Sequence, residues 1–278
     1  MTATEVAKAE HVHQAIEAGV DILWIGARTT VNPFSVQEIA DALKGYDVPV
    51  LVKNPINPDL QLWIGALERI NQAGITKLGA IHRGFSPLSQ SIYRNDPTWK
   101  IPVELKRIIP ELPIVCDPSH IGGSRELIEP ISQMAFDIQM EGLMIETHID
   151  PSVALSDAKQ QVTPAALTSI LDDIVWRHAQ TENKEFARQL TILRNDIDDV
   201  DTELMNLLSK RMRIVDEIAD QKKANDVTIL QVSRYEEILK KRLQQAEMKE
   251  LTPAFVKGIF EHIHQNSIRR QEDIMNAD

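Results

Sequence analysis

The sequence contains a single cysteine, few aromatic residues and no long apolar run, and each shortage excludes a class of protein. Cys116 alone forms neither an internal disulfide nor a cysteine-paired zinc knuckle, so we expect the fold to be stabilised by packing. Aromatic residues make up 5% of the chain, which disfavours a base-stacking surface. There is no run of about 18 apolar residues to cross a membrane, and residues 1–10 lack the basic-then-apolar layout of a secretion signal. We therefore expect a cytoplasmic protein.

Basic residues are also in the minority. The 30 Lys and Arg residues against 41 Asp and Glu residues give a formal charge of −11, which argues against a nucleic-acid surface or a basic membrane anchor. An anionic ligand must therefore be bound by a local cluster of cations. A chain of 278 residues, 43% of them hydrophobic, is long enough for two domains at about 100 to 200 residues each.

Residues 1–178 alternate short apolar runs with longer amphipathic stretches. Such runs, spaced by helix-like segments, indicate parallel strands that are buried on both faces in repeated βα units, and so an α/β domain. The apolar runs are 22–25, 50–52, 78–81, 114–116 and 143–145. The helix-like segments include 58–72, 125–140 and 163–176, the last with Thr163 as N-cap and Pro164 in the first turn.

Residues 179–278 have the spacing of long helices. Apolar residues recur every three or four positions from Phe186 to Ile218, and neither Gly nor Pro interrupts residues 184–224. We expect one helix about 60 Å long there at the usual rise per residue, a second over 232–248, and a third after Thr252 and Pro253. Three helices make a thin core, so this region is expected to dimerise.

Charged side chains follow the apolar runs of the first region. Because the carboxyl ends of parallel strands meet at one edge of a sheet or barrel, these side chains are expected to converge. A single such residue is as often merely solvated, but recurrence in successive units favours binding. The first three are cations and suit a phosphorylated or carboxylated substrate. His120, Glu146 and the later Asp157 suit a divalent metal of the Mn, Fe or Zn type. The residues in strand order are Arg28, Lys53, Arg83, Asp117, His120, Glu146 and His148.

Five segments carry a resemblance to a known family: Trp24–Thr30, Leu51–Pro55, His82–Gly84, Cys116–Gly123 and Leu155–Gln160. They resemble the later strand ends of 3-deoxy-D-arabino-heptulosonate 7-phosphate (DAHP) synthase, a TIM barrel that condenses phosphoenolpyruvate with erythrose 4-phosphate. The resemblance implies that Arg28, Lys53 and Arg83 hold phosphoenolpyruvate, with the backbone of Gly26 and Ala27. It also implies a Mn, Fe, Zn or Co ion on His120, Glu146 and Asp157, with Asp117 beside the reacting groups.

The sequence departs from that family in two motifs. It contains neither the Gly-Pro-Cys-Ser whose cysteine is the remaining metal ligand nor the Lys-Pro-Arg-Thr that contacts both substrates. Since Thr4–Val6 resembles the third strand of the family barrel, we expect about six of eight strands, in a sheet that does not close. Loss of a thiolate ligand and of two cations weakens metal and substrate binding. We expect little or no synthase activity from this chain.

Basic residues in the helical region have a spacing that suggests a shared site. Arg194 and Lys222 are 28 residues apart and share a face of a 3.5-period helix, yet they lie about 42 Å apart along its axis. Both serve one small ligand only if Arg194 comes from a second chain of an antiparallel dimer. Arg211 and Lys222, about 16 Å apart by the same rise, converge on a molecule between them.

This region resembles the all-helical class of chorismate mutase, through residues 193–197, 210–212, 221–223, 232–235 and 267–271. The chorismate-to-prephenate rearrangement requires positioning and electrostatics, and no cofactor. The resemblance implies that Arg211 and the partner chain's Arg194 pair with the substrate carboxylates, and that Lys222 and Gln271 face the ether oxygen. Arg234 would assist a carboxylate and Ser267 would line the pocket.

Tyr235 and Gln231 replace residues that are often acidic in that family, so recognition of the substrate hydroxyl is expected to differ. Two other hypotheses remain open. The helical dimer could bind prephenate or chorismate as a regulatory module, or serve only for dimerisation. The partners expected are chorismate, phosphoenolpyruvate, erythrose 4-phosphate and a second copy of the chain, but no nucleic acid or membrane.

Overall fold

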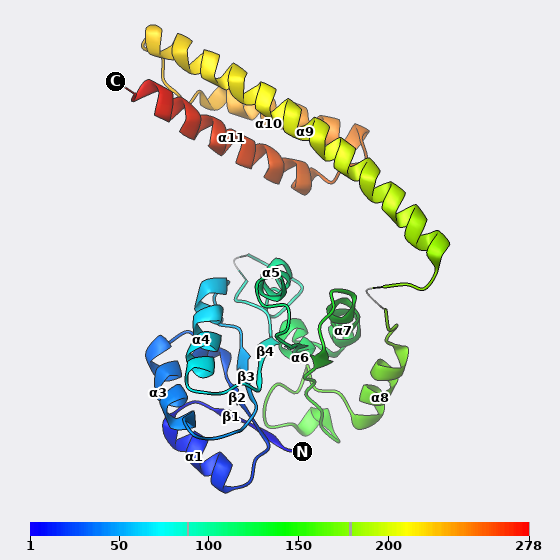
Figure 1. Cartoon of the computed structure of the whole chain (residues 1–278). Coiled ribbons are helices and arrows are strands. Elements are labelled where there is room, and N and C mark those ends of the chain that lie inside the picture. The colour runs from blue at the N-terminus through cyan, green and yellow to red at the C-terminus, as the bar shows by residue number, and fades with distance from the viewer. Residues whose placement is uncertain (88, 178–179, 278) are drawn as a thin grey trace. The chain divides into compact units, whose positions relative to one another are not determined.

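The computed structural model describes residues 1–87, 89–177 and 180–277. It divides into two compact units, Met1–Ala179 and Gln180–Asp278 (Figure 1). The domain boundary expected at residues 178 and 179 falls outside the described residues.

The first unit is built on one sheet of six parallel strands. Their spatial order follows the sequence: β1 (Ala3–Val6), β2 (Ile22–Ile25), β3 (Val50–Lys53), β4 (Leu78–His82), β5 (Ile114–Cys116) and β6 (Gly142–Leu143). The register aligns Val6 with Ile25, Ile25 with Val52 and Val52 with Ala80, so the strand ends form one edge. The expected α/β fold with about six parallel strands of a barrel is confirmed.

Helices follow each strand along the chain, and α8 comes after the last strand. They are α1 (Ala9–Glu17), α2 (Ala27–Thr30), α3 (Pro33–Leu43), α4 (Leu60–Gln72), α5 (Lys100–Ile108), α6 (Pro118–Gly122), α7 (Ile128–Asp137) and α8 (Pro164–Asp173), with short 3-10 turns η1 (Arg125–Leu127) and η2 (Pro151–Val153). Helices α1, α3 and α4 lie side by side along one flank of β1–β4 (Figure 1). The core between them and the strands includes Trp63, Leu67 and Ile39, all of which are buried.

The helix caps follow the sequence signals. Thr163 accepts a hydrogen bond from the backbone N–H of Ala166, with Pro164 at the first helical position, as expected. Asp59 and Asn32 cap α4 and α3 in the same way. Asp117 caps α6 by accepting from the N–H of His120, which ties the end of β5 to the helix that carries this histidine.

The second unit contains α9 (Lys184–Ala224), α10 (Val232–Met248) and α11 (Pro253–Met275). Contacts from Arg211 to Ser267 and from Arg270 to Asp216 align α11 parallel to α9. Lys223, which donates to the backbone carbonyl of Ile274, extends this pairing to the end of α9. The three helices expected over this region are confirmed.

Much of the apolar stripe of α9 is exposed within one chain. Leu193, Ile197, Val200, Leu204 and Leu207 are each more than half exposed, from 52% for Leu204 to 64% for Val200 and Leu207. Contacts with α11 cover only the C-terminal part of the helix, where Val215 and Ala219 are buried. Among the helices of the described ranges, none combines the length and apolar character needed to cross a membrane.

Candidate active sites

The carboxyl ends of the strands surround a cavity of about 480 Å³ in the first unit. Its lining contains seven of the eight residues expected from the sequence to bind phosphoenolpyruvate or a metal. They are Gly26, Ala27, Arg28, Lys53, Arg83, His120 and Asp157. Glu5, Ser86, Arg94 and Asn95 complete the polar part of the lining. Residues from separate βα units are thus brought to one site, as the strand-end pattern predicts.

One wall of this cavity is cationic. Lys53 is the last residue of β3, and Arg83 follows β4 directly. Burial lowers the pKa of Arg83, and the nearby Arg94 and Arg28 lower it further, although Asp117 opposes them. Burial is the larger cause, and the two guanidinium groups act in the same direction. The wall therefore suits a ligand phosphate or carboxylate, because guanidinium groups bind both in bidentate fashion.

The backbone approaches the cavity closely at the end of β2. A Cβ atom on Gly26 would lie 2.2 Å from Oε1 of Glu5, a separation that no side chain tolerates without a shift. Glu5 is in turn held by the indole N–H of Trp24, which donates to its Oε2 at 3.2 Å. Gly26 therefore lets the Glu5 carboxylate lie close to the turn that carries Arg28, and a side chain at position 26 would displace that carboxylate.

Asp117 lies at the centre of the polar network and is fully buried. Its carboxylate accepts from Lys53 Nζ at 2.9 Å and lies 3.0 Å from Nδ1 of His120. Burial by itself raises the pKa of Asp117, but the contacts with His120 and Lys53 outweigh burial and hold that pKa below its usual value. Asp117 therefore stays ionised and links the cationic wall to His120.

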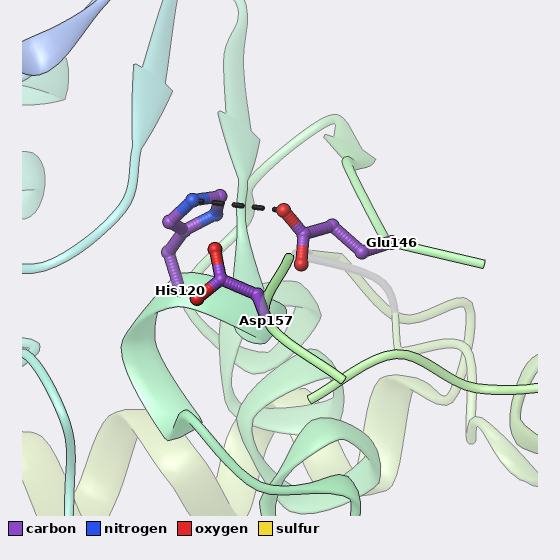
Figure 2. Close-up of side chains that lie close together, drawn as sticks. All are labelled: His120, Glu146 and Asp157. Atoms are coloured by element: carbon purple, nitrogen blue, oxygen red, sulfur yellow. Dashed lines mark ion pairs between the residues drawn. The ribbon is translucent and has the colours of Figure 1, made fainter. Parts of the chain in front are cut away.

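His120, Glu146 and Asp157 face one another (Figure 2), and two of them, His120 and Asp157, line the cavity. Each offers one ligand atom, and these atoms all lie within 4.8 Å of one another. His120 Nε2 is 3.7 Å from Oε1 of Glu146. One imidazole and two carboxylates form a donor set that first-row divalent metals accept, so the residues present fit a metal of this kind. Asp157 has a left-handed backbone with φ of 49°, a conformation found preferentially at functional sites.

The strand-end argument missed three residues of this site. Arg94 and Asn95 come from the long loop between β4 and α5, and Gln160 comes from the loop after η2. Gln160 ends the segment Leu155–Gln160 that carries the family resemblance, whereas Arg94 and Asn95 lie in none of the five segments. His148, by contrast, follows β6 but does not line the cavity, and its Nδ1 accepts from the backbone N–H of Asp150. Cys116 is a core residue, and burial raises the pKa of its thiol.

In the second unit, Arg211 and Ser267 form the centre of a polar cluster. Arg211 donates to Ser267 Oγ at 2.6 Å across the α9–α11 contact. Gln271, one turn later on α11, donates to the backbone carbonyl of Ser267 at 3.2 Å. Ser267 and Gln271 are buried, and Oε1 of Gln271 has no hydrogen-bond partner among the described residues. Burial lowers the pKa of Arg211, and Arg242 lowers it further.

Lys222 lies near the end of α9, in a groove of about 620 Å³ that Gln231 also lines. Its Nζ donates to the backbone carbonyl of Ile229, and partial burial lowers its pKa. Arg234 is exposed and paired with Glu237 at 2.7 Å. Arg194 is exposed on α9 and lies about 25 Å from Arg211 by the helical rise. A single chain therefore brings Arg211, Ser267 and Gln271 together, but leaves Arg194 apart from them.

Sequence reasoning also missed two features of the helical unit. Arg242 on α10 lies over the ring of Phe260, 5.5 Å from its centroid, and its buried Nε lacks a partner among the described residues. The rings of Tyr235 and His264 stack at 4.0 Å with an interplanar angle of 19°. Tyr235 stands at a position expected to be acidic, and the stack gives it a packing role between α10 and α11.

Comparison with known families supports the two-part reading. Residues 1–183 match the family model of the DAHP synthetase I family, and residues 193–272 match that of chorismate mutase type II. Both are families of enzymes.

The first unit is similar to phospho-2-dehydro-3-deoxyheptonate aldolase of Thermotoga maritima, 33% identical over 142 residues that cover 51% of this chain and 40% of that protein. A 2-dehydro-3-deoxyphosphooctonate aldolase of Albidiferax ferrireducens is 32% identical over 85 residues, 27% of this chain and 30% of that protein. The chain thus spans less than half the length of these curated relatives.

Among solved structures, a truncated form of 3-deoxy-D-arabino-heptulosonate 7-phosphate synthase from Thermotoga maritima has a TM-score of 0.55 and 28% identity. The match covers 68% of this chain and 66% of that one. With two thirds of its length inside one family model and the expected side chains gathered at its strand ends, the chain belongs to the DAHP synthetase I family and carries a chorismate mutase type II region in its helical part.

Proposed function

We propose that residues 179–278 convert chorismate to prephenate, and that residues 1–178 form a DAHP synthase-like domain that binds phosphoenolpyruvate and a divalent metal. The observation that supports the mutase function most directly is the Arg211–Ser267–Gln271 cluster. A guanidinium group is held there in fixed geometry beside a buried amide whose Oε1 has no partner in the described residues.

The rearrangement is pericyclic, so the site needs neither a nucleophile nor a proton transfer. It holds a flexible dicarboxylate in its reactive shape and stabilises the charge that develops on the ether oxygen. Arg211 pairs with a carboxylate, while Ser267 fixes the orientation of its guanidinium. Lys222 and Gln271 face the ether oxygen, Gln271 through the second hydrogen of the Nε2 that already donates to the carbonyl of Ser267. Arg234 assists a carboxylate after exchanging its exposed partner Glu237 for the ligand.

The site is completed by a second copy of the chain. Arg194 is too far from Arg211 along α9 to reach the same ligand within one chain. The exposed apolar stripe of α9 starts at the same end of the helix, with Leu193 59% exposed and Ile197 59% exposed. An antiparallel partner helix would cover the stripe and place its own Arg194 beside Arg211 and Lys222.

The test is chorismate consumption by the purified chain and by two lysine variants. Lys222→Ala is expected to lower kcat/KM by at least about a hundredfold, because it removes a charge aimed at the transition state. The adjacent Lys223→Ala is the matched control, since Lys223 is tied to the carbonyl of Ile274, and it should keep the parent rate within a few-fold. Equal rates for the two variants would contradict the proposal.

A regulatory function is the alternative, and the groove beside Lys222 gives it some support. Gln231 lines this groove where the family often has an acidic residue, so the hydroxyl of the ligand meets an amide instead. A module of this kind would bind prephenate or chorismate without turnover. Measurable prephenate binding by a parent protein with no mutase rate would favour the alternative over catalysis. If the helical region served only for dimerisation, Arg211→Ala would change neither the affinity for the ligand nor the rate.

In the first unit, His120, Glu146 and Asp157 would hold the metal, and a bound metal would supply Lewis-acid polarisation of a carbonyl oxygen. Arg28, Lys53 and Arg83 would bind the phosphate and carboxylate of phosphoenolpyruvate, with the backbone of Gly26 and Ala27 against the ligand. Asp117 would keep the Lys53 ammonium and the His120 ring in position through its buried hydrogen bonds.

We expect this chain to have little or no synthase activity. Three ligands are present in the cluster, and the sequence contains neither the family's Gly-Pro-Cys-Ser nor its Lys-Pro-Arg-Thr. The measurement is formation of the condensation product from phosphoenolpyruvate and erythrose 4-phosphate in the presence of Mn²⁺. Turnover at a rate typical of enzymes, about 1 per second or faster, would contradict this expectation.

A further inference from the structure

We propose that Arg94 and Asn95 form a brace that holds the three-residue metal cluster in shape and fixes it relative to Arg83. The two residues are consecutive in the loop between β4 and α5, and both line the strand-end cavity. The proposal rests on the metal-binding part of the function proposed above, and it gives these residues a positioning role rather than a ligand role.

Arg94 connects to the two carboxylates of the cluster. Its Nη1 donates to Oδ1 of Asp157 at 2.7 Å and to Oε1 of Gln160 at 2.6 Å. The amide of Gln160 continues this chain of contacts, because its Nε2 donates to Oε2 of Glu146 at 2.7 Å. One guanidinium group therefore orients Asp157 directly and Glu146 through Gln160.

Gln160 distinguishes this arrangement from an ordinary surface ion pair. Exposed pairs such as Lys44–Asp41 are screened by water and contribute little. Gln160, however, is 1% exposed, and both polar ends of its side chain are used by the contacts to Arg94 and Glu146. A buried amide with both ends bonded has one stable orientation, so it transmits the position of Arg94 to Glu146.

Asn95 connects the same loop to the histidine and to the cationic wall. Its Nδ2 donates to the backbone carbonyl of His120 at 2.6 Å, and its Oδ1 accepts from Nη1 of Arg83 at 2.9 Å. Asn95 is 7% exposed. All three members of the cluster are thus contacted by the brace, through a side chain, an amide relay or a backbone carbonyl, and Arg83 is attached to the same residue.

Two glycines make room for the brace. A Cβ on Gly123 would lie 2.5 Å from Cβ of Arg94, and a Cβ on Gly84 would lie 2.8 Å from the carbonyl oxygen of Asn95. Both glycines have positive φ. The backbone of the brace is also bonded to the turn after β5, with the N–H of Asn95 donating to the carbonyl of Ile121 at 3.1 Å. The loop is therefore anchored at the point where it meets the cluster.

The test measures Mn²⁺ affinity of the full chain by calorimetric titration, without any assay of turnover. Arg94→Met is expected to weaken Mn²⁺ binding by about tenfold to a hundredfold, the usual cost of losing a group that orients metal ligands. The matched control is Lys159→Met, which removes one positive charge from an exposed residue of the loop that carries Asp157 and Gln160. The control should bind Mn²⁺ as tightly as the parent or more tightly, because loss of a nearby cation alone favours a metal ion.

A second variant isolates the relay. Gln160→Met keeps the charge and the approximate volume of the side chain but cannot bond to Arg94 and Glu146, so it should weaken Mn²⁺ binding in the same direction. Thermal unfolding of each variant checks that the fold is retained. Parent-like affinity in either Arg94→Met or Gln160→Met would overturn the brace. A parent protein without measurable Mn²⁺ binding would overturn the metal assignment and the brace together.

Discussion

His82 is a titratable residue that the proposed chemistry does not use. It is fully buried at the end of β4, among the rings of Trp63, Phe85 and Trp99. Both of its ring nitrogens lack a partner among the described residues, and burial lowers the pKa of His82 to about 3. The imidazole therefore stays neutral in the folded protein at pH values where the unfolded chain binds a proton.

This shift makes the first unit sensitive to acid. Between pH 6.5 and about 3 the unfolded state carries a proton on His82 that the folded state does not, so the free energy of unfolding falls as the pH is lowered. Replacement by phenylalanine, His82→Phe, should reduce the pH slope in this window by up to about 1.4 kcal/mol per pH unit. Urea unfolding at a series of pH values measures this slope. Tryptophan fluorescence reports on the first unit, since all four tryptophans lie in residues 24–176.

The exposed residue His13 supplies the control for this experiment. His13→Gln should leave the pH slope of the unfolding free energy unchanged. If His82→Phe had the slope of the parent protein, His82 would not be held neutral by burial, and the interpretation of its environment would be wrong.

Among individual residues, those at the strand ends were predictable, because a parallel sheet brings the carboxyl ends of its strands to one edge for any conformation of the loops. Arg28, Lys53 and Arg83 follow from that rule alone. Arg94 and Gln160 do not, because they come from loops whose paths are set by tertiary contacts with glycines and backbone carbonyls. Periodicity in the sequence carries no signal for such contacts.

Among the elements, the bounds expected for the helices over 184–224 and 232–248 and the start expected for the third helix at Pro253 agree with the structure, whereas the bounds of two shorter helices differ. The expected helix over 125–140 begins instead as a 3-10 turn, with α7 starting at Ile128. That start places Pro130 in the first turn, where a missing N–H breaks no helical hydrogen bond. Helix α8 ends at Asp173 rather than at 176, because the backbone N–H and carbonyl of Val175 are both bonded to the side chain of Gln133.

Helix α9 gives a prediction at this scale. Leu204 lies on the exposed apolar stripe and is 52% exposed in a single chain. If a second copy covers the stripe, Leu204→Glu would bury a charge at the interface and should convert the dimer to a monomer at micromolar concentration. The mutase rate should fall with it, because each site then lacks the partner chain's Arg194. Analytical ultracentrifugation and the chorismate assay measure the two effects.

Thr202→Glu introduces the same charge two residues away, on the other side of α9, and serves as the matched control. In the parent protein, the hydroxyl of Thr202 donates to the carbonyl of Asp198 in the same helix. The control should keep both the dimer and the rate. A Leu204→Glu variant that remained dimeric and active would show that the stripe is not the interface.

On the scale of the whole molecule, the chain joins two sites of different chemistry in one sequence. The strand-end site depends on charge brought together by the sheet and on a cluster that fits a metal. The site proposed in the helical unit would use fixed cations and an amide, without a cofactor. The division into two units was visible in the sequence as a change of period near residue 180, because buried strands and amphipathic helices repeat differently. No periodicity in the sequence indicates assembly with a second copy, which was inferred from the thin core of three helices and from the distance between Arg194 and Lys222 along one helix.

The central claim is that one mutase site draws on two chains, and mixing two inactive variants tests it most directly. Arg194→Ala and Lys222→Ala should each be nearly inactive alone. After the two are unfolded together and refolded in equal amounts, about half of the dimers contain one chain of each kind. Each mixed dimer has one site with both residues intact, so about a quarter of the parent chorismate mutase rate should return. No recovery in verified mixed dimers, or an Arg194→Ala protein as active as its parent, would contradict the shared site.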